Sequence, residues 1–352
     1  MILSCLAHFA WWLQPASDAT RSVLTDIAMI ATPMFLLLSG TMTGLLLARG
    51  DGGRLPVRYV LLNRGLFLMI FGHALVALAE ARSLLAASIV DDIGVSLILI
   101  ATFYTALKSE EVRVRVAYGA LVVYGVLWIA ALVWRPDVGA ALRVKQALIG
   151  PNLQGAMMHT YTAPSLQYVA FYLMGLPMGD VIRRKMNAPD FERRLALLAL
   201  RAGATLIGAV MLVRLLRVLI FGSGSVPLID WTLTIAAKIP PSPAYLAFHV
   251  GLALLIVSAL FELARRRSMH GLALISWFAV IGRASLFCFV LQYFVLWTLP
   301  DLLHLTPSLA AAPLLFAGAI AILWVAAYGW TRIRGNRWMT VGLKPPASVR
   351  VD

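Results

Sequence analysis

Long apolar segments alternate with short polar connections along almost the whole chain. A helix needs about 20 residues to cross the hydrocarbon core of a bilayer, which is about 30 Å thick. Measured against that length, the pattern predicts ten membrane spans, at about residues 1–14, 25–48, 59–79, 84–107, 112–134, 164–182, 195–221, 243–264, 272–299 and 309–331. The chain is therefore predicted to be all-α, a polytopic transmembrane helical bundle.

The composition excludes a soluble protein. Of the 352 residues, 61% are hydrophobic and only 13% are charged. Soluble domains are about 45–50% apolar and roughly 25% charged. Two cysteines, Cys5 and Cys288, both lie in apolar segments, so a disulfide framework is excluded as well.

The net charge of +14 follows the topology. Lys and Arg number 19 in one alternating set of connections and the C-terminal tail, against 6 in the other set. The positive-inside rule places the richer set, and with it both termini, in the cytoplasm. We expect a single membrane domain over 1–331, a basic cytoplasmic tail over 332–352, and a location in the bacterial inner membrane. Because the charge sorts by side, no nucleic-acid partner is predicted.

The first predicted span is short. Its fourteen residues would rise about 21 Å, less than the hydrocarbon thickness. With a cytoplasmic N-terminus, this span should begin several residues earlier, so the first span is expected to be truncated at Met1. Two connections on the non-cytoplasmic side are long, 135–163 and 222–242. The first should contain a short interfacial helix, and both could either cover a substrate site or simply keep water out of the bundle.

Polar residues at one depth are the most informative feature of the spans. At about 1.5 Å per residue, eight polar or charged side chains lie roughly 6–12 Å below the outer surface. They are His8, His73, Asp91, Asp92, Arg214, Arg217, His249 and Gln292. Such a layer suits a water-accessible cavity where a proton moves. Two structural alternatives remain open: each His as an interhelical hydrogen-bond partner, and Asp91 or Asp92 paired with Arg214 or Arg217.

A second set of charged residues belongs to the cytoplasmic side. Arg58 and Arg64 lie at the start of the third span, where Arg64 can snorkel to the interface. Arg283 lies about 16 Å deep and needs an acid, a carbonyl or a phosphate as its partner. These arginines predict a site for a phosphate-bearing ligand, although Arg58 could serve topology alone. No metal is predicted, because the histidines and acids lack a ligand-like spacing.

Two pairs of glycines point to close helix packing. Gly40 and Gly44 form one small-xxx-small motif, and Gly175 and Gly179 form another. Glycines at this spacing let two helix backbones approach each other, so we interpret both pairs as structural.

Several stretches resemble multipass membrane acyltransferases. The segment TPMFLLLSGTMTGLLLAR (32–49) is similar to the "P-x-F-x-x-L-S-G" segment of the acyltransferase-3 type and of heparan-α-glucosaminide N-acetyltransferase-like bacterial proteins. IPPSPAYLAFHVG (239–251) and VIGRASLFCFVLQYF (280–294) resemble later segments of these families, in the same order. FYLMGLPMGDVIRR (171–184) looks like their mid-chain glycine-containing span.

The resemblance implies a reaction and roles for residues. These families transfer an acyl group from cytoplasmic acyl-CoA across the bilayer to a hydroxyl or amine of a glycan or lipid. His8 matches their candidate catalytic histidine, while the arginine that precedes it in the family would lie before Met1. Arg64 and Arg283 match basic positions near the donor. Gln292 stands where the family often has His, so the role of that His is not carried over.

The predicted site combines both lines of reasoning. His8 is expected to be the general base, oriented by Asp91 or Asp92. His73, His249, Arg214 and Gln292 are expected to bind the acceptor, and Arg58, Arg64 and Arg283 the phosphates of acyl-CoA, with acetyl the expected acyl group. No oxyanion-stabilising group can be named. The sequence leaves room for a homo-oligomer.

A different class of function stays open beside the acyltransferase. The same layer of His and Asp could relay protons in a proton-coupled secondary transporter or in a glycan or lipid exporter. No inverted repeat or matching pair of broken helices is visible in the sequence, which favours the enzyme. A non-catalytic scaffold would not need three histidines at one depth.

Overall fold

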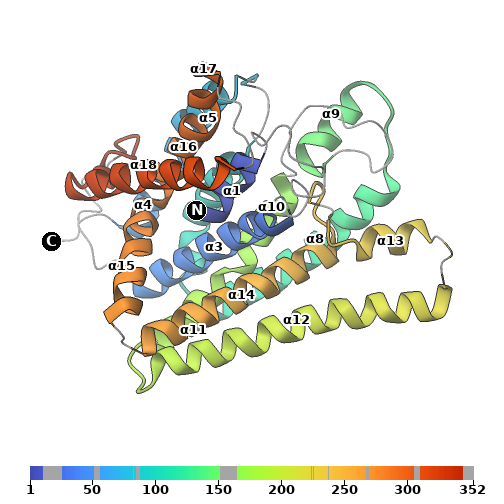
Figure 1. The fold of residues 1–352 in the computed structure, drawn as a ribbon. Coiled ribbons are helices and arrows are strands. Elements are labelled where there is room, and N and C mark those ends of the chain that lie inside the picture. The colour runs from blue at the N-terminus through green and yellow to red at the C-terminus, as the bar shows by residue number, and fades with distance from the viewer. Residues whose placement is uncertain are drawn as a thin grey trace.

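Helices make up nearly all of the molecule (Figure 1). The computed structural model describes residues 1–10, 26–50, 56–81, 83–84, 88–150, 165–222, 224, 226–236, 238–266, 269–304 and 310–343. Over these ranges no β-strand forms, and the only bridge of β type joins Lys238 to Pro241. The predicted all-α class is confirmed.

The helices follow the chain in the order printed in Figure 1. They are α1 (Ile2–Ala10), α3 (Ala31–Arg49), α4 (Val57–Phe67), α5 (His73–Ala79), α6 (Ile89–Thr102), α7 (Tyr104–Leu107), α8 (Glu110–Val133), α9 (Gly139–Leu148), α10 (Ser165–Met174), α11 (Leu176–Lys185), α12 (Phe191–Phe221), α13 (Pro227–Leu233), α14 (Pro243–Arg265), α15 (Met269–Arg283), α16 (Ser285–Tyr293), α17 (Leu299–Leu302) and α18 (Ala312–Arg332). Two π-helical turns, η1 (Leu68–Gly72) and η2 (Phe294–Thr298), join α4 to α5 and α16 to α17, and a 3₁₀ turn, η3 (Gly335–Arg337), follows α18.

Seven helices of the described chain are long and apolar enough to cross a membrane. They cover Asp26–Arg49, Val57–Ala79, Glu110–Val133, Phe191–Phe221, Pro243–Arg265, Ser285–Leu302 and Ala312–Arg332. The protein is therefore a multi-pass membrane protein. Each of these seven coincides with a predicted span or with part of one.

The other predicted spans are short or interrupted helices. The 84–107 segment is divided into α6 and α7 at Phe103, and the 164–182 segment into α10 and α11 at Gly175. In 272–299, the helix is interrupted at Ala284, between α15 and α16. The first segment forms only the nine residues of α1 within 1–10, and residues 11–14 lie outside the described chain. Apolar periodicity detects such segments but does not detect a break inside them.

Local sequence explains where several helices begin and end. Ser88 starts α6 with a capping box that Asp91 closes, and Ser242 caps α14 by accepting a hydrogen bond from the amide of Tyr245 at 2.9 Å. Helix α3 ends at Gly50, whose φ of 72° is readily available only to glycine. The short helix predicted within 135–163 forms as α9.

The two glycine motifs pack against each other, which confirms their structural role. A Cβ atom on Gly44 would lie 2.0 Å from the carbonyl oxygen of Leu176, and one on Gly179 would lie 2.1 Å from the amide nitrogen of Leu45. Helices α3 and α11 therefore touch backbone to backbone, and any larger side chain at these positions would push them apart.

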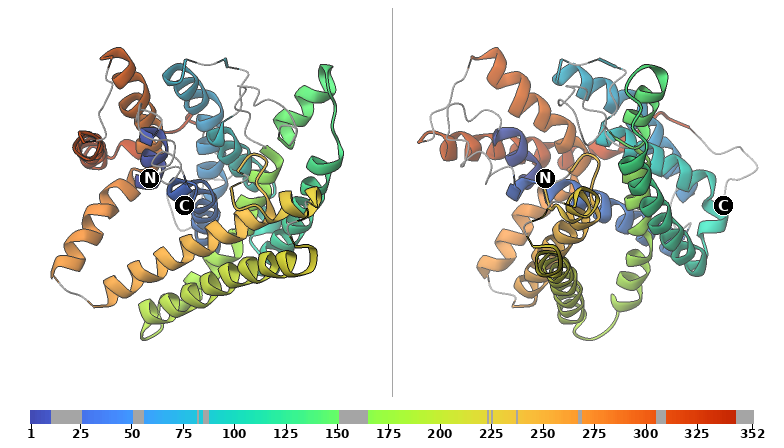
Figure 2. Two further views of the ribbon diagram at one scale, coloured as in Figure 1. Left: turned by 45° about the vertical axis from the view of Figure 1, so that its right-hand side comes forward. Right: turned by 90° about the vertical axis from the view of Figure 1, so that its right-hand side faces the viewer.

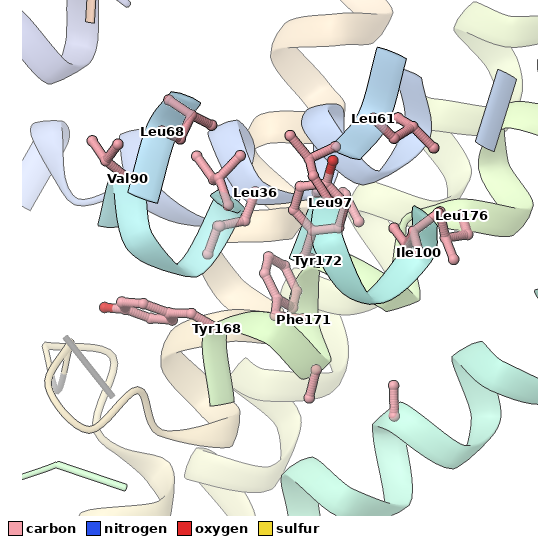
Figure 3. Close-up of a cluster of buried hydrophobic side chains, with 14 of the residues drawn as sticks. Leu36, Leu61, Leu68, Val90, Leu97, Ile100, Tyr168, Phe171, Tyr172 and Leu176 are labelled. Atoms are coloured by element: carbon pink, nitrogen blue, oxygen red, sulfur yellow. The ribbon is translucent and has the colours of Figure 1, made fainter. Parts of the chain in front are cut away.

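The core lies where α3, α4, α6 and α10 meet. Its largest buried side chains include Leu36, Leu61, Leu68, Ile100 and Tyr172, drawn in Figure 3. Helices α12 and α14 run side by side along one edge of the bundle, with α14 between α12 and α3 (Figures 1 and 2). Most of the α12 surface is left for lipid, as expected of an outermost span.

The segment after α18 folds back onto the bundle. The side-chain amide of Asn336 donates a hydrogen bond to the carbonyl oxygen of Arg283 at 2.8 Å. Further along, the buried amide of Asn63 on α4 binds both backbone groups of Leu343, at 2.8 and 2.9 Å. The described part of the predicted tail thus spans from α15 to α4, and residues 344–352 lie outside the described chain.

Candidate functional site

Helix α1, which carries His8, is fastened to α16 through Gln292. The Gln292 side chain is fully buried. Its amide donates to the hydroxyl of Ser4 at 3.1 Å, and its oxygen accepts from the Cys5 thiol at 3.3 Å. Sequence analysis assigned Gln292 to substrate binding. In the structure both ends of its amide are hydrogen-bonded to α1.

His8 lies one helical turn beyond Ser4 and packs on two aromatic rings. Its imidazole is 4.7 Å from the ring of Tyr293 and 6.0 Å from that of Trp297, measured between centroids. The side chain is half-buried. Within the described residues, neither ring nitrogen of His8 has a hydrogen-bond partner.

Lys238 brings His8 and His249 into one cluster. The ammonium of Lys238 interacts electrostatically with the imidazole of His8 on α1 and with that of His249 on α14. His249 is buried and also interacts with Asp26. We call His8, His249 and Lys238 the His–Lys cluster. Two of the three predicted histidines thus interact with the same lysine.

The tautomer of His249 is set by its own helix. Its Nδ1 lies 2.9 Å from the carbonyl oxygen of Tyr245, an acceptor, so Nδ1 carries the proton. The neutral ring then presents Nε2 as a bare acceptor. The rings of Tyr245 and Phe248 enclose the imidazole, at 4.5 and 5.4 Å between centroids.

Sequence analysis missed Lys238, which lies in the connection between α13 and α14. Burial lowers the pKa of its ammonium below the ordinary lysine value, and no described carboxylate forms a salt bridge with it. One signal was available: Lys238 is the only Lys or Arg of 222–242, and it directly precedes IPPSPAYLAFHVG. The sequence pattern gives Lys238 only as part of the charge of its connection, because a depth below the membrane surface can be predicted only for residues inside a span.

The backbone around Lys238 is held by buried hydroxyl groups. Tyr168 of α10 donates to the carbonyl oxygen of Lys238 at 3.2 Å, and Tyr124 of α8 donates to that of Pro241 at 2.8 Å. Ser242 donates to the carbonyl oxygen of Thr234 at 2.5 Å. In Figure 3 the Tyr168 hydroxyl points away from Tyr172 and the rest of the core. The loop that carries Lys238 is therefore fixed to α8, α10 and α14.

Asp91 is occupied by partners other than His8. Both its oxygens lie 2.9 Å from Nδ1 of His73, and one accepts from the backbone amide of Ser88 at 2.6 Å. Nε2 of His73 lies 2.8 Å from the carbonyl oxygen of Leu84. Two acceptors facing one ring require both nitrogens to be protonated for a full set of hydrogen bonds. Asp91 thus orients an imidazole, but it is that of His73.

Asp92 and Gln167 are buried without ordinary hydrogen bonds. Asp92 is fully buried on α6, and neither carboxylate oxygen accepts a hydrogen bond of standard geometry from a described residue. It interacts electrostatically with Ser165 and with Tyr168, the residue that holds the Lys238 backbone. Gln167, on α10, is equally buried and equally unsatisfied among the described residues.

The suggested ion pairs between α6 and α12 do not form. Arg217 pairs with Asp230 of α13 at 2.7 Å and donates to the carbonyl oxygens of Gly222 and Gly224. Arg214 is half-buried on α12, the outermost helix, with α14 between it and α3. Depth placed Arg214 in the polar layer, but no described carboxylate forms an ion pair with it.

The three arginines predicted to bind acyl-CoA are all exposed. Arg64 interacts electrostatically with Tyr172, whose hydroxyl lies 2.7 Å from that of Thr43. Arg283 is the last residue of α15 and donates to the carbonyl oxygen of Ala279 at 3.2 Å. The Arg283 side chain is exposed at the helix break that directly follows it. The segment after α18 contacts both Arg283 and Asn63, the neighbour of Arg64.

One buried ion pair was not predicted from the sequence. Arg113 of α8 donates through Nε to a carboxylate oxygen of Asp180 on α11 at 2.8 Å, and its second nitrogen binds the other oxygen. It also donates to the carbonyl oxygens of Leu107 and Lys108. With four of its five N–H donors used inside the protein, the buried pair joins α8 to α11.

An apolar groove lies beside α1. It has a volume of about 210 Å³ and lies between α1, the η2–α17 segment and α18. Its lining includes Phe9, the neighbour of His8, together with Leu296, Leu299, Leu315 and Ile322. A groove of this composition fits a hydrocarbon chain and no charged group.

The arrangement can accept a proton at a neutral imidazole beside a fixed cation, with apolar surface next to it. Among the described side chains, no three or more His, Cys, Asp or Glu residues gather so as to hold a metal ion. Comparisons with protein-family models, with curated proteins and with solved structures gave no match to this chain. The positions of these residues are therefore the basis for any assignment of function.

Proposed function

We propose that this protein is a membrane-bound acyltransferase. It moves an acyl group, with acetyl the expected one, from cytoplasmic acyl-CoA to a hydroxyl or amine of an extracytoplasmic glycan or lipid. The observation that carries the proposal is the His–Lys cluster: two imidazoles interact electrostatically with a lysine that has no described carboxylate partner. The order of the sequence segments that resemble membrane acyltransferases supports the same reaction.

In the proposed reaction, His8 takes the proton of the acceptor hydroxyl as that oxygen attacks the thioester carbonyl carbon. The carbonyl electron pair moves onto oxygen and gives a tetrahedral oxyanion. When the carbonyl re-forms, the carbon–sulfur bond breaks, and the CoA thiolate takes the proton back from His8. General-base assistance of this kind contributes about 10²–10⁴-fold. His249, with Nε2 open, accepts a hydrogen bond from the acceptor and orients it.

Donor binding is assigned to the other end of the bundle. Arg58, Arg64 and Arg283 are exposed there and carry the positive charge that the phosphates of CoA require. From Ser285, next to Arg283, to Trp297, which packs on His8, the helix advances roughly 18 Å. The extended arm of CoA would run along this path from the arginines to the His–Lys cluster. The apolar groove beside Phe9 would take the hydrocarbon part of a lipid acceptor.

We infer a topology of ten crossings with both termini in the cytoplasm. The seven long apolar helices supply most of them. The pairs α6–α7 and α10–α11, together with α1, would complete the set as interrupted or short crossings. The alternation of basic connections supports this sidedness, and a bacterial inner membrane is the setting it implies.

A proton-coupled transporter remains the second candidate, and one observation favours it. Asp92 is fully buried, and neither oxygen accepts a standard hydrogen bond from a described residue. A carboxyl group in such a place gains and releases protons readily as its surroundings change, as proton relays in membranes do.

The deciding experiment uses purified full-length protein with radiolabelled acetyl-CoA. It measures CoA release and label in the glycan and lipid fractions. We expect acceptor-dependent CoA release in the wild type and its loss in His8→Ala. His304→Asn is the matched control, because His304 is exposed at the end of α17 and its φ of 48° suits asparagine.

Two results would contradict the proposal. Absence of CoA turnover together with pH-driven uptake into vesicles would favour transport, and Asp92→Asn should then abolish that uptake. Equal activity in His8→Ala and His304→Asn would remove His8 from the reaction even if acyl transfer occurs.

A further inference from the structure

A second pocket, with a volume of about 420 Å³, lies between the start of α12 and the end of α14. The two helices run side by side (Figure 1), and their backbones come close at Gly203 and Gly251. A Cβ atom on Gly203 would lie 2.7 Å from the carbonyl oxygen of Gly251. Nearer the pocket, the hydroxyl of Ser258 donates to the carbonyl oxygen of Ala196 at 2.8 Å. Both of these residues line the pocket, which therefore opens where the close packing of the two helices ends.

The polar part of this pocket has an excess of positive charge. Arg193 of α12 and Arg265 of α14 line it together with Glu262. The two oxygens of Glu262 accept hydrogen bonds from Arg265 at 2.8 and 2.6 Å, and one also accepts from Arg266 at 3.2 Å. Arg265 uses two of its five N–H groups in this pair. Arg193 forms no ion pair with a described carboxylate, so both lining arginines have N–H groups to offer an anion.

The other part of the pocket wall is apolar and belongs to a membrane span. Leu197 and Leu200 line it, and both are exposed on α12. They follow Arg193 along the helix, so the apolar wall continues from the arginines into the span Phe191–Phe221. A ligand that matches this order has an anionic head and a hydrocarbon chain, as an anionic phospholipid does.

One more arginine lies beside the apolar wall. Arg201 follows Leu197 by four residues, so the two side chains are neighbours on the helix surface. It is exposed within the span, and no carboxylate in the described part of the chain pairs with it. Side chains on a helix lean toward its N-terminus, which is the end where the pocket lies. A charge inside a span is costly, and a lipid phosphate nearby would lower that cost.

We propose that this pocket binds one anionic phospholipid, with the phosphate at Arg193 and Arg265 and one acyl chain along the two exposed leucines. The inferred topology places this end of both helices on the cytoplasmic side, where basic pockets between transmembrane helices suit anionic head groups. Ser258, the lining residue of α14 nearest to His249 in sequence, lies roughly 14 Å further along the helix. The lipid site is therefore separate from the His–Lys cluster and does not depend on acyl transfer.

The test titrates the purified full chain in detergent with phosphatidylglycerol and with phosphatidylcholine of the same acyl chains. Native mass spectrometry measures the affinity of the first bound lipid. We expect phosphatidylglycerol to bind at least about fivefold more tightly, since each arginine near an anionic head group contributes about that factor. Arg193→Gln and Arg265→Gln should each lower the affinity for phosphatidylglycerol about fivefold and leave that for phosphatidylcholine unchanged.

Arg115→Gln is the matched control. Arg115 is also an exposed arginine paired with a glutamate of its own helix, Glu111 at 2.6 Å, but it does not line the pocket. Its substitution should leave the affinity for phosphatidylglycerol unchanged. Two further probes separate the head group from the chains. Short-chain phosphatidylglycerol should bind more weakly than the long-chain lipid, and inorganic phosphate at equal concentration should not displace the long-chain lipid.

Three results would overturn the lipid site. Equal affinities of the wild type for phosphatidylglycerol and phosphatidylcholine would mean that the head-group charge is not recognised. An equal loss in Arg115→Gln would show that surface charge in general attracts the lipid. Displacement by inorganic phosphate would assign the pocket to a free anion. Because none of these measurements involves acyl-CoA, the lipid site and the acyltransferase proposal can fail separately.

Discussion

Two adjacent carboxylates show how the surroundings of a residue decide its role. Asp91 receives hydrogen bonds from His73 of α5 and from the backbone amide of Ser88 at the start of α6, so both partners of its carboxylate lie in these two helices. Asp92, one residue on, points into the interior and finds no standard hydrogen bond among the described residues. Asp91 caps the start of α6 and is paired with His73, so its role is structural. Asp92 is held inside the bundle at a cost in stability.

This contrast predicts opposite effects of the same substitution. Asp91→Asn should lower the melting temperature in detergent, because a buried cap and a charged pair weaken, which costs about 1–3 kcal/mol. Asp92→Asn should leave the melting temperature unchanged or raise it, since an amide is cheaper to bury than a carboxylate. Circular dichroism melts of both variants measure this. A larger loss in Asp92→Asn would mean that Asp92 has a strong partner.

Buried Lys145 makes stability depend on pH. Burial, and secondarily the charge of Arg135, lowers the pKa of its ammonium below the unfolded value of 10.5. Between the folded and unfolded pKa values the unfolded chain binds more protons, so this contribution to stability rises with pH and is complete above the unfolded value. We expect the melting temperature to increase over that alkaline window in the wild type and to increase less in Lys145→Met. Parallel profiles in the two proteins would refute the effect.

At the scale of the helix, α1 is short and depends on its neighbours. Nine residues cannot be stable alone, so packing and the Gln292 hydrogen bonds must place His8. This makes Gln292 a positioning residue, although it touches no substrate.

Gln292→Leu should therefore lower acyl-transfer kcat about tenfold, in line with the loss of hydrogen bonds of ~1 kcal/mol each. The KM for acyl-CoA should stay constant, because the arginines at the other end are untouched. Ser4→Ala, which removes only one of the two bonds, should show a smaller loss. Wild-type kcat in Gln292→Leu would show that α1 is held by packing alone.

The segment after α18 is an element in its own right, fastened by Asn63 and Asn336. Asn63→Ala removes both hydrogen bonds to Leu343, so the amides of 338–343 should exchange hydrogen faster while the transmembrane helices keep their protection. Asn336→Ala is the control, because it releases only the contact with Arg283. Hydrogen exchange followed by mass spectrometry measures the exchange rates of these amides in both variants. Unchanged exchange in Asn63→Ala would show that the segment is held elsewhere.

At the scale of the whole molecule, the inferred sidedness can be tested directly. Asp137, in the connection between α8 and α9, and Asn187, between α11 and α12, are both exposed. In intact cells, an impermeant maleimide should label Asp137→Cys, whereas Asn187→Cys should need permeabilised cells. Buried Cys5 and Cys288 should remain unlabelled. Labelling of both sites from the same side would overturn the ten-crossing topology.

Apolar periodicity alone predicted the all-α class and seven of the long helices, because the bilayer imposes length and composition on every span. The glycine motifs likewise predicted a backbone contact, which α3 and α11 make. Helix breaks at Phe103, Gly175 and Ala284 were missed, since an apolar residue at a break has the same hydropathy as one inside a helix.

Sequence by itself determined that this chain is a helical membrane protein, which residues are polar at membrane depth, and how the basic connections alternate. Only the tertiary structure decided which polar groups meet: it joined His8 and His249 through Lys238, gave Asp91 to His73, used Gln292 to hold α1 and left Arg214 on the outermost helix. The physical reason is geometric. Position along a span determines depth, whereas contacts also depend on the order and rotation of helices around the bundle, which packing of distant segments determines.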